Sequence, residues 1–217
     1  RPAPEDRRDL RLAAAQPLSR RLRLRTAWLG LALWAGPALA DDVAQQWQQV
    51  SEAGIAQANE GDLVAAERSM REALALFGSD AASLAPRIPP ALIHGGADHL
   101  VLALRDRAAL SAMHYSLAQG RLLMRREGLV TILLVHVAGD RLFHTRNAFA
   151  YGGVYEDPAT GAATAAFAGY LRDLHWPHGG AIDIVQGEDM GMPSRLRAEI
   201  PAEPGSSIRV SGGARWI

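Results

Sequence analysis

Two almost uninterrupted apolar runs, HLVLAL at 99–104 and LVTILLVHV at 129–137, constrain the fold of this chain most strongly. A strand with one face in water alternates apolar and polar residues, and these runs do not alternate. They therefore predict strands buried on both faces, with other elements packed above and below the sheet. Between them, residues 106–126 carry apolar side chains at helical spacing, which predicts one helix.

The remaining pattern also indicates a sheet accompanied by one clear helix. Residues 138–140 predict a hairpin turn into a strand at 141–145. Alternating residues near 182–184, 196–200 and 208–210 predict half-buried strands, and the short links between them favour antiparallel pairing. A helix is expected from Gly161 to Leu174, and its many alanines make it slim enough to lie inside a curved sheet.

Composition and charge exclude several classes of function. The chain of 217 residues contains no cysteine, which rules out disulfides, cysteine-ligated zinc and a thiol nucleophile. Its formal net charge is zero, so the chain lacks the excess of positive charge that is typical of nucleic-acid-binding proteins. The charge is nevertheless uneven, because residues 1–40 are basic, residues 41–85 are acidic and residues 86–217 are nearly neutral. Three separate pieces are therefore expected.

Residues 1–40 are rich in arginine and resemble a signal peptide in their second half. Four arginines between Arg20 and Arg25 precede fifteen uncharged residues, and the sequence PALA ends this stretch before Asp41. A basic region, a short apolar region and small residues before a cleavage point are typical of secretory signals. Fifteen residues are too few for a membrane span, so no stable membrane insertion is expected. An Arg-rich helix packed on the following residues is the alternative.

Residues 41–85 are predicted to form an α-helical hairpin and a linker. Apolar positions between Val43 and Phe77 fall at helical spacing, and Glu60 to Asp62 predict the turn between two helices. Gly78 to Pro90 is predicted to be a linker, since it is rich in proline. Two explanations of this pattern are equally good, namely an ordinary amphipathic hairpin and one repeat of the tetratricopeptide type. Seven residues resemble one tetratricopeptide-type repeat: Trp47, Gly54, Ala58, Gly61, Ala66, Ala73 and Leu74.

The stretch EDPATGAA at 156–163 predicts a strand end, a turn and a helix start. Thr160 is a candidate cap for that helix. The first backbone N–H groups of the helix, from Gly161 to Ala163, would point out of its end, where the helix dipole favours an anion such as a carboxylate. Asp157 would lie beside this anion site and could hold an amine. A capped structural helix without a ligand is the alternative reading.

Several motifs in residues 86–217 resemble the phenazine-biosynthesis PhzF-like family. They occur in the order and at the spacing of that family, and they cover only the C-terminal half of its usual chain. The matching stretches are Arg146 with Gly153 to Gly161, Gly169 to Leu171, Gln186-Gly187, Met190 to Ser194, and Ile208 to Ala214.

The resemblance implies an α+β fold, namely one lobe of a diaminopimelate-epimerase-like fold, preceded here by the α-helical hairpin. Such a lobe is a curved, mostly antiparallel sheet around a central helix, which would be 161–174. The implied activity is a cofactor-independent, metal-free isomerisation of a small carboxylic acid such as a dihydro-hydroxyanthranilate. Asp157, Gly161 and Ala162 are the implied substrate-binding residues. The resemblance also implies a cytoplasmic location, although the segment 20–40 leaves export to the periplasm open, and it leaves homodimerisation open.

The family's catalytic residue, a glutamate from a first lobe, has no counterpart that we can assign in this chain. Ala162 stands where the family usually has serine, so a hydroxyl contact is lost. We therefore expect a truncated isomerase. The alternatives are an exported, non-catalytic helical-repeat scaffold and a misjoined reading frame. The glutamates of the acidic segment do not lie in a matching context: Glu52, Glu60, Glu67 and Glu72.

Overall fold

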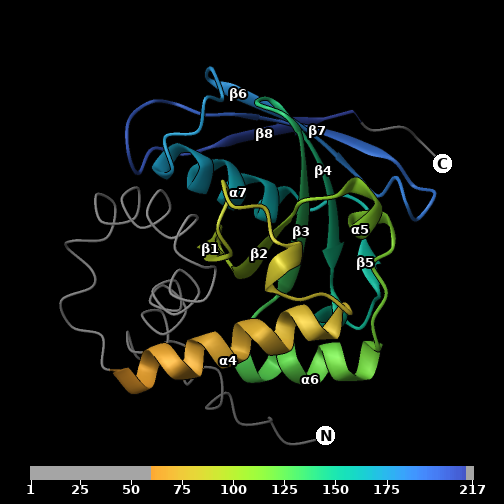
Figure 1. Ribbon diagram of the computed structural model, residues 1–217. Helices are drawn as coiled ribbons and strands as arrows, with labels where there is room; N and C mark the ends of the chain where they lie inside the picture. The colour runs from red at the N-terminus through yellow and green to blue at the C-terminus, as the bar shows by residue number, and fades with distance from the viewer. Residues whose placement is uncertain (1–59, 214–217) are drawn as a thin grey trace, which may run out of the picture.

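The computed structural model describes residues 60–213 (Figure 1). The signal-like segment and the first helix of the expected hairpin lie outside this range. Within it, no helix combines the length and the apolar character that crossing a membrane requires.

A single mixed sheet forms the centre of the described region. Its strands run in the order β1-β2-β3-β4-β6-β7-β8, and β5 pairs with β4. Neighbours are antiparallel except at β2–β3 and β4–β6, so the predicted mostly antiparallel sheet is confirmed. The strands are β1 Ala91–His94, β2 Asp98–Leu104, β3 Thr131–Gly139, β4 Leu142–Ala148, β5 Glu156–Asp157, β6 Ala181–Gln186, β7 Ser194–Glu199 and β8 Arg209–Gly212.

Helices cover both sides of this sheet. Helix α7, Gly161–Asp173, lies inside the curve of the sheet and packs on β1, β7 and β8 (Figure 1). Helices α4, Glu60–Leu76, and α6, Leu117–Glu127, run side by side on the other face. The short α5, Arg107–Ser111, and the 3₁₀ helices η1, Ala81–Ser83, and η2, Ala150–Gly152, complete the set. The predicted central helix inside a curved sheet is therefore confirmed.

Successive residues of β2 and β3 point into two different hydrophobic cores. Val101 and Ala103 pack on the α7 side with Phe167, whereas Leu100 and Leu102 pack on the side of α4 and α6. This arrangement explains the absence of alternation in the two apolar runs, because both faces are covered along β2 and along the first five residues of β3. The prediction that both faces are buried is confirmed.

The prediction of a single helix at 106–126 is wrong, because residues 112–116 are not helical and separate α5 from α6. Tyr115 leaves the helical path to stack on Tyr155, with ring centroids 4.4 Å apart, and Ser116 caps α6 by accepting a hydrogen bond from the Gln119 N–H. The carbonyl groups at the end of α5 turn to the buried guanidinium of Arg146. A distant arginine thus satisfies carbonyls that a continuous helix would have satisfied itself.

Two further local predictions need correction. Glu60 to Asp62 belong to α4 and do not form a turn. The expected linker is packed on the sheet, since Leu84 and Ile88 are buried and the Ala85 N–H donates to the Ala103 carbonyl over 2.8 Å. Proline richness indicated irregular structure correctly, but the apolar residues between the prolines attach the segment to the edge of β2.

Candidate substrate-binding site at the start of helix α7

Three strand ends meet beneath the first turn of α7. Asn147 lies near the end of β4, where it pairs in register with Asp157 of β5, and Gln186 ends β6. Asn147 and Gln186 are each 0% exposed, whereas Asp157 is half-buried. The turn from β5 to α7 therefore rests on two buried amide side chains.

The hydroxyl of Thr160 joins these three residues. It donates to Oδ2 of Asp157 over 2.5 Å and accepts from Nδ2 of Asn147 over 2.5 Å and from Nε2 of Gln186 over 3.0 Å. A hydroxyl has one proton and two lone pairs, so its hydrogen-bonding capacity is filled. Oδ1 of Asp157 has no hydrogen-bond partner among the described residues.

Thr160 occupies the N-cap position of α7, but its side chain caps nothing. The predicted N-cap position is therefore confirmed, but the capping hydrogen bond is absent. The physical reason is that Asp157 and the two amides already use the hydroxyl. Ser116 and Asp80, by contrast, cap their own helices in the usual way, because each accepts from a backbone N–H three residues on.

The start of α7 consequently presents uncapped N–H groups at the surface. Gly161 and Ala162 are exposed, Ala163 is buried, and the N–H groups of these three residues have no hydrogen-bond acceptor within residues 60–213. The helix dipole adds partial positive charge at this end. An anion the size of a carboxylate fits this chemistry, with Asp157 as an acceptor beside it.

Close backbone approaches hold this arrangement from two sides. Gly187 adopts a φ of +75°, and a Cβ there would lie 3.0 Å from the carbonyl oxygen of Pro158 and 2.4 Å from that of Met192. A Cβ on Gly95, in the β1–β2 turn, would lie 2.6 Å from the carbonyl oxygen of Ala162. Both glycines let other backbone segments press against the turn and the helix start.

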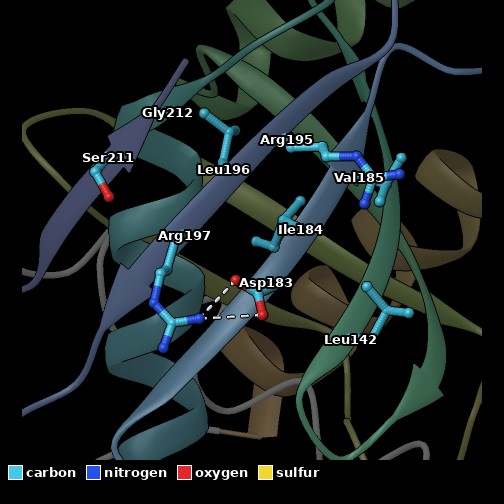
Figure 2. Close-up of a pocket in the computed structure, with 9 residues that line it drawn as sticks. All are labelled: Leu142, Asp183, Ile184, Val185, Arg195, Leu196, Arg197, Ser211 and Gly212. Atoms are coloured by element: carbon cyan, nitrogen blue, oxygen red, sulfur yellow. Dashed lines mark hydrogen bonds and ion pairs between the residues drawn. The ribbon is translucent and has the colours of Figure 1, made fainter.

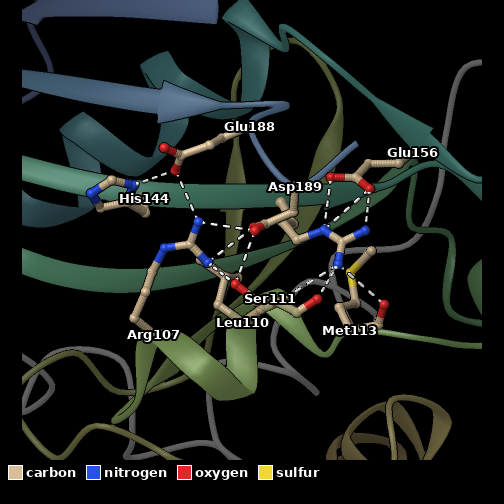
Figure 3. Close-up of polar contacts among 9 residues, drawn as sticks. Arg107, Leu110, Ser111, Met113, His144, Glu156, Glu188 and Asp189 are labelled. Atoms are coloured by element: carbon tan, nitrogen blue, oxygen red, sulfur yellow. Dashed lines mark hydrogen bonds and ion pairs between the residues drawn. The ribbon is translucent and has the colours of Figure 1, made fainter. Parts of the chain in front are cut away.

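A buried ion pair supports the strand that carries Asp157 (Figure 3). Nη2 of Arg146 lies 2.6 Å from Oε2 of Glu156, and Nε lies 3.0 Å from Oε1. The side chains are 8% and 2% exposed. The same guanidinium donates to the carbonyls of Ser111 and Met113, so one side chain ties β4, β5 and the end of α5 together.

A second polar cluster ties α5 to the loop after β6 (Figure 3). Arg107 contacts Asp189 and Glu188, and Nδ1 of His144 lies 3.0 Å from Glu188. Burial alone would raise the pKa of the Asp189 carboxyl, but hydrogen bonds from Arg107 and Ser111 outweigh burial and lower it. Hydrogen bonds from Arg107 and then His144 lower the pKa of Glu188.

A surface hollow of about 370 Å³ lies elsewhere, on β4, β6, β7 and β8 (Figure 2). Asp183 and Arg197, two of its lining residues, form an ion pair, and none of the residues around Thr160 lines it. Within residues 60–213, no group of three histidine or acidic side chains is placed to hold a metal ion.

The structure brings together the three predicted substrate-binding residues, Asp157, Gly161 and Ala162, at one end of α7. Sequence reasoning missed Asn147 and the use of Gln186. The available signal was an amide side chain at or near the end of each of two strands, close to the family motif.

The chain belongs to the PhzF-type family: a profile described as phenazine biosynthesis-like protein matches residues 15–216. This match begins well before residue 86, the start of the region to which the resemblance was assigned from the sequence motifs.

Relatives within this family are named as isomerases. A trans-2,3-dihydro-3-hydroxyanthranilate isomerase from Pseudomonas aeruginosa is 35% identical over 127 residues, which are 57% of this chain and 44% of that protein. An uncharacterized isomerase from Mesorhizobium japonicum is 43% identical over 79 residues, which are 35% of this chain and 26% of that protein. The aligned part of the chain thus spans less than half the length of these relatives.

Solved structures agree on the fold. A protein from Pseudomonas aeruginosa, described as a predicted epimerase, superposes with a TM-score of 0.54 at 26% identity. The superposed region covers 67% of this chain and 49% of that protein. A PhzF family protein from Bacillus anthracis gives the same TM-score at 15% identity over 64% of this chain and 50% of its own. The fold of the described region is that of a diaminopimelate-epimerase-like lobe.

Proposed function

We propose that this chain is the ligand-holding lobe of a cofactor-independent isomerase that shifts a proton on a small carboxylic acid such as a dihydro-hydroxyanthranilate. The observation that carries the proposal is the uncapped start of α7 beside an oriented carboxylate. Isomerase names among the relatives support the class of reaction.

The substrate carboxylate would accept from the N–H groups of Gly161 and Ala162, and the substrate amine would donate to Oδ1 of Asp157. The two groups are adjacent on an anthranilate ring, and the two protein elements are adjacent at the helix start. Ala162 supplies only its backbone group, since it lacks the hydroxyl usual in the family. A charge-assisted hydrogen bond of this kind contributes about 1.5–3 kcal/mol.

Proton transfer needs a positioned acid/base group. Glu156 does not supply one, because Arg146 engages both of its carboxylate oxygens in a buried pair. We propose that Asp157 holds the amine and that the proton-transferring carboxylate belongs to a first lobe, as the family resemblance implies. The 217-residue chain should then bind ligand without turnover.

A titration tests the proposal with 3-hydroxyanthranilate, a stable aromatic compound that carries the same carboxylate and amine. Asp157→Asn should weaken its binding about tenfold or more, because a carboxylate acceptor becomes a neutral amide. Asp140→Asn, a change of the same kind at an exposed turn, is the control.

Absence of binding to the wild-type chain would refute the proposed function. Unchanged binding by Asp157→Asn would remove Asp157 from the site. Turnover of a dihydro-hydroxyanthranilate, followed by absorbance, would contradict the assignment of the acid/base group to another lobe.

A further inference from the structure

The Thr160 hydroxyl is held away from the position that a residue of its type normally takes. Rotation toward the helix would let it accept from an N–H of the first turn of α7 and would stabilise the helix. It points instead at Oδ2 of Asp157. Two amide donors, from Asn147 and Gln186, occupy its lone pairs, and its proton therefore has Asp157 as its acceptor.

The side chain of Gln186 makes several hydrogen bonds to the turn between β5 and α7. Its Nε2 donates to the backbone carbonyl of Asp157 over 2.6 Å as well as to the Thr160 hydroxyl, and its Oε1 accepts from the Thr160 N–H over 3.3 Å. One side chain thus fixes both ends of the turn from Asp157 to Thr160. Gly187, which follows it, presses on Pro158 within the same turn.

Asn147 is placed at a cost in stability. Its side chain is fully buried, and its Oδ1 has no hydrogen-bond partner in the described part of the chain, which an apolar residue would have avoided. Leu133, its register partner on β3, shows that apolar side chains fit this part of the sheet. The hydrogen bond that the Asn147 side chain does make is the one from its Nδ2 to the Thr160 hydroxyl.

We infer that Asn147 and Gln186 are positioning residues that act on Asp157 through Thr160. They direct the Thr160 proton to Oδ2, which leaves Oδ1 without a partner in residues 60–213 and free to accept from a donor on the ligand. The same contacts keep the hydroxyl from capping α7, so the N–H groups of the first turn stay free for an anion. The ligand half of this inference rests on the proposed function, whereas the hydrogen-bond half does not.

The ligand arm compares two probes that differ by one group, 3-hydroxyanthranilate and 3-hydroxybenzoate. Their affinity ratio reports the amine contact to Asp157 and is insensitive to a general loosening of the fold. Thr160→Val should reduce the ratio about tenfold, Gln186→Met should do the same, and Thr160→Ser should restore it. Thr145→Val is the control, because Thr145 lies on the same strand as Asn147 and its buried hydroxyl has no hydrogen-bond partner between residues 60 and 213.

The ligand-free arm is a double-mutant cycle on the unfolding equilibrium in urea. Thr160→Val and Asp157→Ala should be coupled by about tenfold in the unfolding constant, because each removes the one hydrogen bond that the two residues share. The coupling should disappear when Gln186→Met is added. Asn147→Leu provides an independent route should Gln186→Met not fold.

The outcomes separate the inference from the proposed function. Wild-type protein that binds neither probe refutes the proposed function, and the urea cycle then decides the inference alone. Additive effects of Thr160→Val and Asp157→Ala overturn the inference, as does coupling that survives both Gln186→Met and Asn147→Leu. An affinity ratio unchanged by Thr160→Val, in protein that does bind, also overturns it.

Discussion

Replacing Glu156 by glutamine leaves the guanidinium of Arg146 buried without its counter-charge. Breaking one side of a buried ion pair typically costs about 3–5 kcal/mol. The glutamine carbonyl can still accept one hydrogen bond, and the Ser111 and Met113 carbonyls still receive theirs, so the low end of that range applies. We expect Glu156→Gln to reduce the free energy of unfolding by about 3 kcal/mol.

Urea denaturation followed by circular dichroism measures this loss. The matched control is Asp183→Asn, which also removes one carboxylate charge from an arginine pair. Asp183 and its partner Arg197 are 52% and 46% exposed, although the shortest distance between them, 2.9 Å, is close to that of the buried pair. Exposed pairs contribute about 0–1 kcal/mol, so the control should lose less than about 1 kcal/mol.

Equal losses in the two variants would refute the reasoning, because the difference depends only on burial. Arg146→Met adds a second check, since it also deprives the carbonyls at the end of α5 of their donor and should cost more than Glu156→Gln. The double variant should lose less than the sum of the two single losses, since no charge is then left unpaired.

Two further predictions concern backbone conformation and titration. Gly187→Ala should reduce the free energy of unfolding, measured in urea, by about 2 kcal/mol or more and should weaken ligand binding, because a positive φ is combined with close contacts to Pro158 and Met192. Gly191 also has a positive φ, but a Cβ there would have no described neighbour within 4 Å, so Gly191→Ala should cost only the conformational part. Burial lowers the pKa of His99, against a smaller upward effect of Asp98. The neutral ring therefore stabilises the fold fully above pH of about 6.5 and progressively less below it. His99→Gln should flatten the fall in urea midpoint between pH 7.5 and pH 5, and an unchanged slope would contradict the pKa direction.

The sequence pattern predicted the parts of the fold whose signal is local. β2 and β3 were visible as apolar runs, and the alanines from Ala162 onward identified α7 as the slim central helix. The break between α5 and α6 was not visible, because its cause, Arg146, lies more than thirty residues away in the sequence. Helical spacing on both sides of the break is real, so periodicity alone predicts one helix.

The candidate site shows the same division. The turn and helix start around Asp157 and Gly161 follow from local chemistry and from the family motif. The diversion of Thr160 from its cap does not, because local preference favours the cap and two residues from other strands override it. Asn147 and Gln186 meet only after β4, β5 and β6 are assembled, and the pairing of strands is what brings them within reach.

The two cores on opposite faces of β2 affect how strongly the register of this strand is specified during folding. In a strand with one wet face, a slip by one residue exposes apolar groups and is heavily penalised. A slip of β2 would exchange its two apolar sets and expose neither. Size must then discriminate, because the leucines face α4 and α6 while Val101 and Ala103 face α7. Enlarging Ala103 to leucine should therefore make the two alignments closer in free energy, and misaligned, compact chains would accumulate during refolding.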